Sequence, residues 1–300
     1  MAKKRKWNSE IATYNFMMVP AVVLLFIFSI IPLFGIVIAF QNYVPAKGIL
    51  GSEWVGLDYF ELMLQMPDSK QIFLNTIVIS VGKIVMNIIV PVAFALMLNE
   101  VRVKAVKKTV QTIVIMPHFL SWVILGNIFI TMLSLDGLVN NVITALGGEG
   151  IMFLGSNTWF QPVVIITATW KDFGYSAIIY LSALTSIDPN IYEAASIDGA
   201  SHWKQITRIT LPMLIPTIIL MLTLALGGVL NAGFDQVFNL YNPSVYKTGD
   251  IIDTYVYRMG LVDFQYSLST AVGLMKSVVS FILIITSNYL AKKFSGYSMF

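Results

Sequence analysis

The sequence contains no cysteine, and this excludes disulfides, zinc–thiolate sites, iron–sulfur clusters and a cysteine nucleophile. Charge is also scarce, because Asp, Glu, Lys and Arg make up 12% of the 300 residues, against about 25% in a typical soluble domain. The two histidines, His118 and His202, lie far apart in the sequence, and no cluster of carboxylates flanks either of them. We therefore expect neither a metal site nor a catalytic site in this chain.

A phosphate-binding loop is also missing. Its consensus is G-x-x-x-x-G-K-[ST], and Gly82-Lys83 lacks both the upstream glycine and the following hydroxyl residue. The chain therefore has no such device for binding ATP, and we expect it to be neither an enzyme nor the holder of a cofactor.

The sequence is instead rich in long apolar stretches. Hydrophobic residues make up 57% of the chain, and a transmembrane helix needs about 20 mostly apolar residues. Six stretches qualify, so we predict an all-α integral membrane protein with spans at about 16–40, 71–98, 110–133, 161–184, 212–234 and 267–291. The first stretch is longer than the roughly 7–15 apolar residues of a cleaved signal peptide, so we expect it to remain as a span.

The positive residues indicate which side faces the cytoplasm. Twelve of the 19 Lys and Arg residues fall on the side that holds both ends of the chain, four fall on the other side, and three lie inside predicted spans. Cytoplasmic loops carry the excess of Lys and Arg. We therefore predict that the N-terminal segment 1–15, the loop 185–211 and the tail 292–300 are cytoplasmic, around a transmembrane domain at 16–291.

The loop at 185–211 predicts two short helices. Asp188 can cap the first helix with Pro189 at its first position, and Gly199 suits a left-handed stop. Ser201 can cap a second helix, and Pro212 marks the start of the next span. Such a structured hairpin fits either docking to a partner protein or an amphipathic element that lies on the lipid headgroups.

The same loop resembles the EAA motif of binding-protein-dependent ABC importer permeases. That pattern is Glu-Ala-Ala, three residues, Gly, nine residues, Ile, one residue and Leu-Pro. The matching positions, together with neighbours on the same hairpin, are Tyr192, Glu193, Ala194, Ala195, Asp198, Gly199, Ile209, Leu211 and Pro212. The resemblance implies a type I importer permease fold whose cytoplasmic coupling helix docks in a separate ATPase subunit, which binds ATP and Mg.

Four further stretches resemble sugar permeases, and the last three of them resemble a narrower branch of that class. The first outer loop carries 55–60, similar to a GLDNF-like stretch, and the last outer loop carries 233–243 and 253–258, which look like permeases for polysaccharides or complex oligosaccharides of the lipoprotein-associated type. The basic tail at 291–297 is also similar. The resemblance implies a heterodimer with a second permease, two ATPase subunits and an extracytoplasmic solute-binding protein in a bacterial cytoplasmic membrane.

Ionisable groups within predicted spans are functional candidates, because charge is costly there. Helical spacing puts Thr76, Ser80, Lys83 and Asn87 on one face of the second span and Gly227, Asn231 and Asp235 on one face of the fifth. The candidates for a substrate path are Lys83, Asn87, Trp170, Lys171, Tyr175, Asn231, Asp235 and Lys276.

Two interpretations of these groups remain open. They can line a water-filled path in which rings stack on sugars and polar groups bind hydroxyls. Alternatively, they can bind one another across helices, for instance Lys171 or Lys276 with Asp235. If two of the three lysines are paired, about one positive charge is left for the solute, and this favours an acidic glycan.

These observations predict a permease subunit that imports an oligosaccharide by alternating access. An importer of the same architecture for an amino acid or a phosphate ester stays open, as does an ion-coupled secondary transporter. Residues alone indicate only a polar path, and the sugar class comes from the resemblance.

Overall fold

The computed structural model describes residues 9–295, with side chains described for residues 12–289. Residues 1–8 of the predicted N-terminal segment and 296–300 of the predicted tail lie outside this range. The helices are α1 (Ser9–Leu25), α2 (Ile31–Leu33), α3 (Gly48–Gly51), α4 (Asp58–Gln65), α5 (Pro67–Asn99), α6 (Lys104–Ile115), α7 (Trp122–Leu133), α8 (Leu138–Ala145), α9 (Phe160–Thr185), α10 (Pro189–Ile197), α11 (His202–Gln205), α12 (Leu211–Gly227), α13 (Phe234–Leu240), α14 (Tyr246–Gly249), α15 (Ile252–Tyr257) and α16 (Tyr266–Ser295). A two-stranded antiparallel sheet pairs β1 (Gln41–Asn42) with β2 (Glu53–Trp54).

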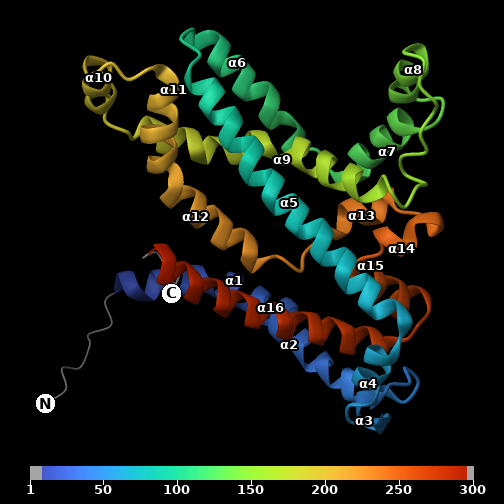
Figure 1. Cartoon of the computed structure of the whole chain (residues 1–300). Helices are drawn as coiled ribbons and strands as arrows, with labels where there is room; N and C mark the ends of the chain where they lie inside the picture. Colours follow the sequence, from blue (N-terminus) through green and yellow to red (C-terminus); the bar gives the residue numbers. More distant parts are fainter. Residues whose placement is uncertain (1–8, 296–300) are drawn as a thin grey trace, which may run out of the picture.

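The long helices cross one another in a splayed bundle (Figure 1). Helix α9 packs along α5, and α12 packs against α16 as well as against both of them. The stretch that begins with α1 continues through π-helical Phe26–Ile30, α2 and 3-10 Phe34–Phe40, and its end packs on α16. Serine 267 joins these two ends, because its hydroxyl donates to the Gln41 carbonyl and accepts from the Tyr43 amide.

The fold is the predicted all-α membrane architecture. Five helical stretches of the described chain are long and apolar enough to cross a membrane, namely Ala12–Phe40, Pro67–Asn99, Trp122–Ala145, His202–Gly227 and Tyr266–Tyr289. Helix α9 is also long enough, but with Lys171 and Asp172 in its middle it is not apolar enough to be counted among these five stretches. Many of its residues are buried by neighbouring helices, so it depends less on contact with lipid. Counting α9, the arrangement agrees with about six spans.

The predicted third span at 110–133 is not one helix. It is divided into α6, a 3-10 turn at Met116–Phe119 and α7. Pro117 cannot donate a backbone hydrogen bond, which weakens an α-helix at that point. Ser121 then starts α7, because its hydroxyl accepts from the Ile124 amide at 3.4 Å. Helix α7 ends at Leu133, as predicted, and after a turn at 134–137 the apolar stretch continues through α8 to Ala145.

The helix in the structure differs from the predicted fifth span, 212–234, at both ends. The helix begins ten residues earlier, because α11, π-helical Ile206–Thr210 and α12 form one continuous stretch from His202. It ends at Gly227, since two consecutive glycines favour helix termination, and Gly233 has a left-handed φ of 92° before α13 starts. Gly227, Asn231 and Asp235 therefore do not share one helical face, and that prediction is wrong.

Two buried clusters frame the middle of α5, α9 and α12. The cluster nearer the α10–α11 hairpin includes Val92, Tyr180 and Leu214, and the cluster nearer α13 includes Ile79, Val164 and Val237. Each contains apolar side chains from α5 and α9, so the two helices are held together at both levels. The residues between the two clusters on these helices are more polar, and they form the cavity described below.

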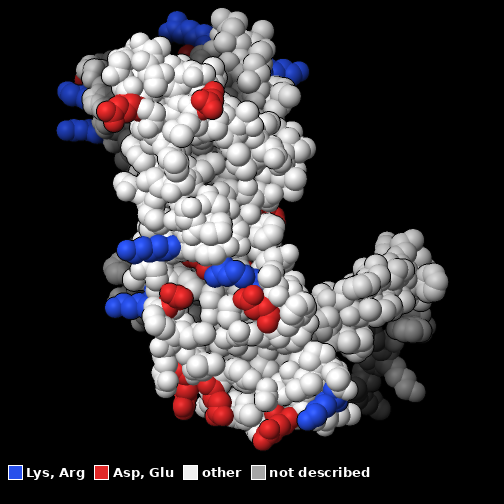
Figure 2. Space-filling view, turned by 90° about the vertical axis from the view of Figure 1, so that its right-hand side faces the viewer, with Lys and Arg blue, Asp and Glu red and all other residues white. Residues whose placement is uncertain are grey.

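Much of the apolar surface is not covered by this chain. The most apolar 18-residue window of Ala12–Phe40 has 0% of its residues buried. Figure 2 shows a face of the molecule formed mostly by uncharged residues, with Lys, Arg, Asp and Glu confined to small groups. Such surfaces require lipid or another apolar chain against them, because water contact with this much apolar area is unfavourable.

Candidate functional site

A polar cavity of about 370 Å³ lies between α5, α9 and the end of α12. Four of the predicted path residues line it, namely Lys83, Asn87, Tyr175 and Asn231. The other lining residues are Ser80, Ile84, Ile88, His118, Asp172, Ser176, Met221, Ala225 and Gly228. Hydroxyl, amide, imidazole, ammonium and carboxylate groups therefore converge on one space between membrane helices, as a passage for a polar solute requires.

Lys83 presents its ammonium group at this cavity. The Nζ atom donates to the Ala232 carbonyl at 2.5 Å, just beyond the end of α12. In the described part of the chain, no carboxylate lies within 4.0 Å of this nitrogen. An ammonium has three donors, so this one keeps capacity for a further acceptor. Gly233 permits the arrangement, because a Cβ atom at that position would lie 2.9 Å from the Lys83 Nζ atom.

His118, Asp172 and Tyr175 form a second polar group on the cavity wall. The His118 Nδ1 atom lies 2.9 Å from the Asp172 Oδ1 atom, and the Tyr175 ring stacks on the imidazole with centroids 4.3 Å apart. The break between α6 and α7 brings His118 to this position. Sequence reasoning set His118 aside as a metal or catalytic residue, although an imidazole within a predicted span was itself a signal of function.

Lys171 and Trp170 do not line the cavity. The buried Lys171 ammonium donates to the His118 carbonyl at 2.6 Å and lies 4.0 Å from the Asp172 carboxylate. It therefore satisfies the backbone carbonyl that the break at Pro117 exposes. Trp170 points elsewhere and meets Phe129 of α7 edge to face, with ring centroids 5.7 Å apart. For these two residues the structural interpretation fits better than the path interpretation.

Lys276 is paired, but not with the predicted acid. Its ammonium donates to Asp253 of α15 at 2.5 Å and to the Asn231 Oδ1 atom at 2.8 Å. The suggested pairing of Lys171 or Lys276 with Asp235 is wrong, and Asp235 is exposed on α13. Asp253 was missed because it lies in an outer loop in the sequence, and only the fold of 228–265 brings it to α16.

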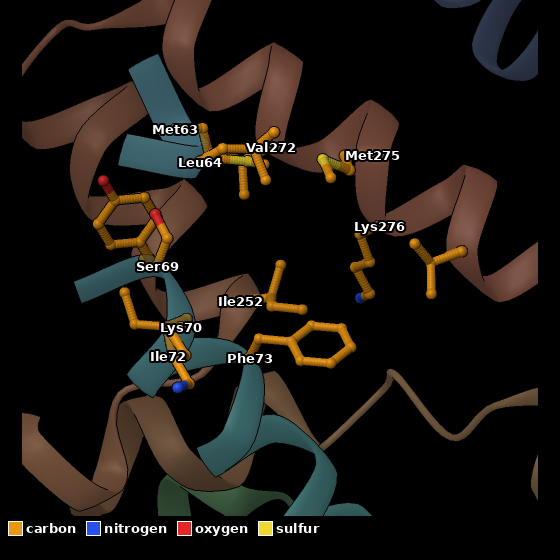
Figure 3. Close-up of a pocket in the computed structure, with 12 residues that line it drawn as sticks. Met63, Leu64, Ser69, Lys70, Ile72, Phe73, Ile252, Val272, Met275 and Lys276 are labelled. Carbon is orange, nitrogen blue, oxygen red and sulfur yellow. The ribbon is translucent and has the colours of Figure 1, made fainter. Parts of the chain in front are cut away.

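A second pocket, of about 340 Å³, is a poor candidate for a polar solute. Figure 3 shows Met63, Val272 and Met275 on one side and Ile72, Phe73 and Ile252 on the other. Two lysines reach its edge, Lys70 and Lys276, and Lys276 is already paired with Asp253. An apolar wall offers almost nothing to sugar hydroxyls, so the cavity at Lys83 is the candidate site.

The hairpin of α10 and α11 has the predicted helices and the predicted capping of the first one, but the predicted cap of the second is wrong, because the Ser201 side chain accepts no capping hydrogen bond at the start of α11. The Asp188 carboxylate accepts from the Asn190 amide at 2.9 Å and caps α10. The helix ends in a Schellman motif, with the Ala200 amide donating to the Ala195 carbonyl at 2.9 Å and Gly199 at a φ of 74°. Tyr192 anchors the hairpin, since its hydroxyl lies 3.0 Å from the Thr210 hydroxyl.

The outer face of this hairpin has no partner within the described chain. Glu193, Ala194 and Asp198 are exposed, and the side chains of Ile197 and Trp203 are 87% and 72% exposed. A rigid hairpin with uncovered apolar side chains, held at the end of α5 and α12, is suited to docking on another protein.

The sequence matches one protein family and is similar to known bacterial permeases. Residues 89–296 match the family described as the binding-protein-dependent transport system inner membrane component. The chain is 44% identical over 279 residues to the Polygalacturonan/rhamnogalacturonan transport system permease protein YteP of Bacillus subtilis, an alignment that covers 93% of this chain and 87% of YteP. It is 40% identical over 299 residues to Protein LplB of the same organism, covering 99% of this chain and 92% of LplB.

Two solved structures have the same fold as this chain. One is a bacterial ABC transporter involved in the import of the acidic polysaccharide alginate, with a TM-score of 0.87 and 36% identity over 96% of this chain and 97% of that one. The other is a bacterial alginate ABC transporter in complex with an alginate pentasaccharide-bound periplasmic protein, with a TM-score of 0.87 and 35% identity over 97% of this chain and 98% of that one.

Proposed function

This chain belongs to the family of binding-protein-dependent transport system inner membrane components, and from that premise we propose that it carries an acidic oligosaccharide through the cytoplasmic membrane. As a member of that family it is a permease subunit of an ABC importer, a transport protein and not an enzyme. The observation that carries the proposed cargo is the polar cavity between α5, α9 and α12, with the Lys83 ammonium at its wall and no carboxylate partner for it among the described residues.

The acidic character of the cargo is supported by the charges at the cavity. Asp172 on the cavity wall already has His118 at 2.9 Å and the buried Lys171 at 4.0 Å, so the Lys83 ammonium has no carboxylate of its own among the described residues. A cation in a site of low dielectric attracts a carboxylate much more strongly than it does in water. The similarity to permeases for polygalacturonan and alginate points in the same direction, since both polymers contain uronic acid units.

The energy for transport would come from partner subunits that bind ATP and Mg. The hairpin of α10 and α11 is the proposed docking element, with Glu193 and Gly199 in the coupling helix and Ile209, Leu211 and Pro212 leading into α12. A second, homologous permease would cover the apolar surface that this chain leaves open. The termini and the hairpin would face the cytoplasm, and the segment between α12 and α16 would face the solute-binding protein outside.

Reconstitution in proteoliposomes tests this proposal. The complete importer is assembled from this permease, a second permease, two ATPase subunits and the solute-binding protein, and uptake of a labelled galacturonan oligosaccharide is measured. We expect uptake that requires both ATP hydrolysis and the binding protein, and none with this chain alone or with a non-hydrolysable ATP analogue. Uptake by this chain alone under a proton or sodium gradient would contradict the proposal. So would a complete importer that takes up an amino acid or a phosphate ester but no glycan.

A further inference from the structure

Two sequence stretches that resemble the oligosaccharide branch, 233–243 and 253–258, are not explained by the cavity. None of their residues lines the cavity, although Asn231, two residues before the first stretch, does. In the structure the two stretches become α13 and α15, which pack against each other beyond the end of α12 (Figure 1). Their resemblance to one branch of permeases therefore maps to one place in the fold.

Aromatic rings connect these two helices in a continuous row. Phe234 stacks on Phe238 with ring centroids 5.2 Å apart, and Tyr257 contacts both, at 5.6 Å and 4.9 Å. Phe238 then contacts Tyr241 at 6.0 Å, and Tyr241 contacts Tyr246 at 5.2 Å. We call Phe234, Phe238, Tyr241, Tyr246 and Tyr257 the aromatic row.

The row is the open face of a segment whose other face is buried. On α13, Gln236, Val237 and Leu240 are buried, and the Gln236 amide donates to the Val164 carbonyl of α9 at 2.7 Å. On the opposite face Phe238 is 37% exposed, and the other four rings of the row are partly exposed. Apolar and amide side chains of the same helices fill the core, and of the five rings Tyr241 also packs against the buried cluster around Val237.

The row is also held rigidly at its outer end. Arg258 lies over the Tyr246 ring, 4.5 Å from its centroid, and donates to the buried Asp250 carboxylate at 2.5 Å. Burial acts to lower the pKa of the Arg258 guanidinium, but the hydrogen bond to Asp250 and its charge outweigh burial, so the pKa is raised. Arg258 therefore remains charged, and it positions Tyr246 by a cation–π contact.

The inner end of the row meets the cavity. Phe234 follows Asn231 by three residues, and Asn231 both lines the cavity and accepts from Lys276. Tyr257 lies one helical turn beyond Asp253, the other partner of Lys276. The rings thus extend outward from the polar groups at the cavity edge.

We infer that the aromatic row is a binding subsite for the sugar rings of a glycan that extends beyond the cavity. This inference rests on the proposed function and adds a chain-length requirement to it. A pyranose ring has C–H faces that pack on aromatic rings, and a row of rings with few hydrogen bonds binds successive sugars without fixing their register. Long oligosaccharides contact the row and the cavity together, whereas a disaccharide in the cavity does not reach the row.

Uptake of uronate oligosaccharides of two lengths, a disaccharide and a hexasaccharide, tests this inference in the complete reconstituted importer. Phe238→Leu keeps an apolar side chain and removes the ring. Loss of one ring contact of this kind corresponds to roughly a threefold to tenfold change in binding. We expect the concentration for half-maximal uptake of the hexasaccharide to rise by that factor, with no change for the disaccharide.

Two further variants separate ring stacking from general damage. Phe238→Trp keeps an aromatic face and should behave like the wild type. Phe264→Leu removes an exposed ring of the same outer segment, which contacts Tyr266 outside the row, and should also leave both uptake curves unchanged.

The outcomes distinguish the subsite from the proposed function. If the wild-type importer transports both glycans and Phe238→Leu alters the two equally, or alters neither in a normally assembled complex, the row is a structural or interfacial aromatic cluster and the inference is overturned. If the wild-type importer transports neither glycan but moves another solute, the proposed function fails and the subsite fails with it.

Discussion

The ionisable residues inside the membrane region differ in whether the chain itself supplies them with a charged partner. Lys276 has Asp253, and Lys171 has Asp172 together with the His118 carbonyl. Lys83 has only the Ala232 carbonyl among the described residues. Burial of an ammonium beside a single neutral acceptor is unfavourable unless another anion or water completes its shell. Lys83 is therefore the residue that a solute carboxylate would meet.

Replacing Lys83 with methionine should change which glycans are transported. Lys83→Met keeps the side-chain length and removes the charge, so an acidic oligosaccharide loses a charge-assisted hydrogen bond and its uptake at low concentration should fall roughly tenfold or more. The carboxyl-reduced, neutral analogue should change little. Initial uptake rates of the two glycans in the same vesicles measure this difference.

Lys276→Met is the matched control at the residue scale. It also removes one ammonium from the same membrane region, but it leaves Asp253 without its partner and removes the polar link between α16 and α15. Uptake of acidic and neutral glycans should therefore decline together. Equal losses for both glycans in Lys83→Met as well would show that Lys83 has a structural role only.

Helical periodicity was sufficient to find Lys83 and Asn87, because both lie with Ser80 on one face of an unbroken helix. The sequence could not find Asp253 or exclude Asp235. Their positions depend on how 228–265 folds back on α5 and α16, across sequence separations that no local pattern reports. The sequence also could not tell where the Trp170 ring points. It contacts Phe129 of α7, whereas the adjacent Lys171 points to the His118 carbonyl.

Among the helices, the α10–α11 hairpin was predicted best from the sequence. Asp188, Pro189 and Gly199 act on the backbone within a few residues of their own positions, so capping and stop signals are visible without tertiary contacts. The third and fifth spans were predicted less well. Hydropathy reports apolar length, but it does not report where Pro117 or the glycines at 227 and 228 interrupt a helix.

Gly199 should be required for coupling and not for insertion. Its left-handed φ of 74° disfavours a β-branched residue by about 1–2 kcal/mol, enough to distort the Schellman motif that sets the end of α10. No other heavy atom lies within 4 Å of the position that a Cβ would take, so the effect is one of backbone conformation and not of crowding. We expect Gly199→Val to assemble in the membrane but to lose substrate-stimulated ATP hydrolysis and uptake.

Gly199→Asn provides the comparison, since asparagine visits left-handed backbone conformations more readily than other residues. It should retain most of the stimulated ATPase activity. Full stimulation of hydrolysis and normal uptake in Gly199→Val would refute the assignment of this hairpin as the coupling element.

At the scale of the whole molecule, the described chain leaves several apolar and polar surfaces uncovered. The apolar stretch Ala12–Phe40 is uncovered, the hairpin carries exposed Ile197 and Trp203, and the cavity at Lys83 is lined by this chain on α5, α9 and α12. A second permease, an ATPase and lipid would cover these three kinds of surface. The sequence predicted the membrane class and a polar path, and Lys83, Asn87, Tyr175 and Asn231 of that path line the cavity. It did not predict His118 in the cavity wall, because only the break between α6 and α7 brings that residue there.

The central claim is that the cavity opens alternately to the two sides of the membrane as the ATPase changes its nucleotide state. The native chain has no cysteine, so single replacements can report accessibility to an impermeant thiol reagent. Ser176→Cys is a nearly isosteric change in the cavity wall, and Ser201→Cys and Ser244→Cys mark the exposed hairpin and the exposed outer loop.

Labelling from outside intact cells or right-side-out vesicles is the most direct measurement. The account predicts that Ser244→Cys is always labelled, Ser201→Cys never, and Ser176→Cys in one nucleotide-trapped state but not in the other. Equal labelling of Ser176→Cys in both states would contradict alternating access through this cavity, and labelling of Ser201→Cys without Ser244→Cys would contradict the orientation of the chain.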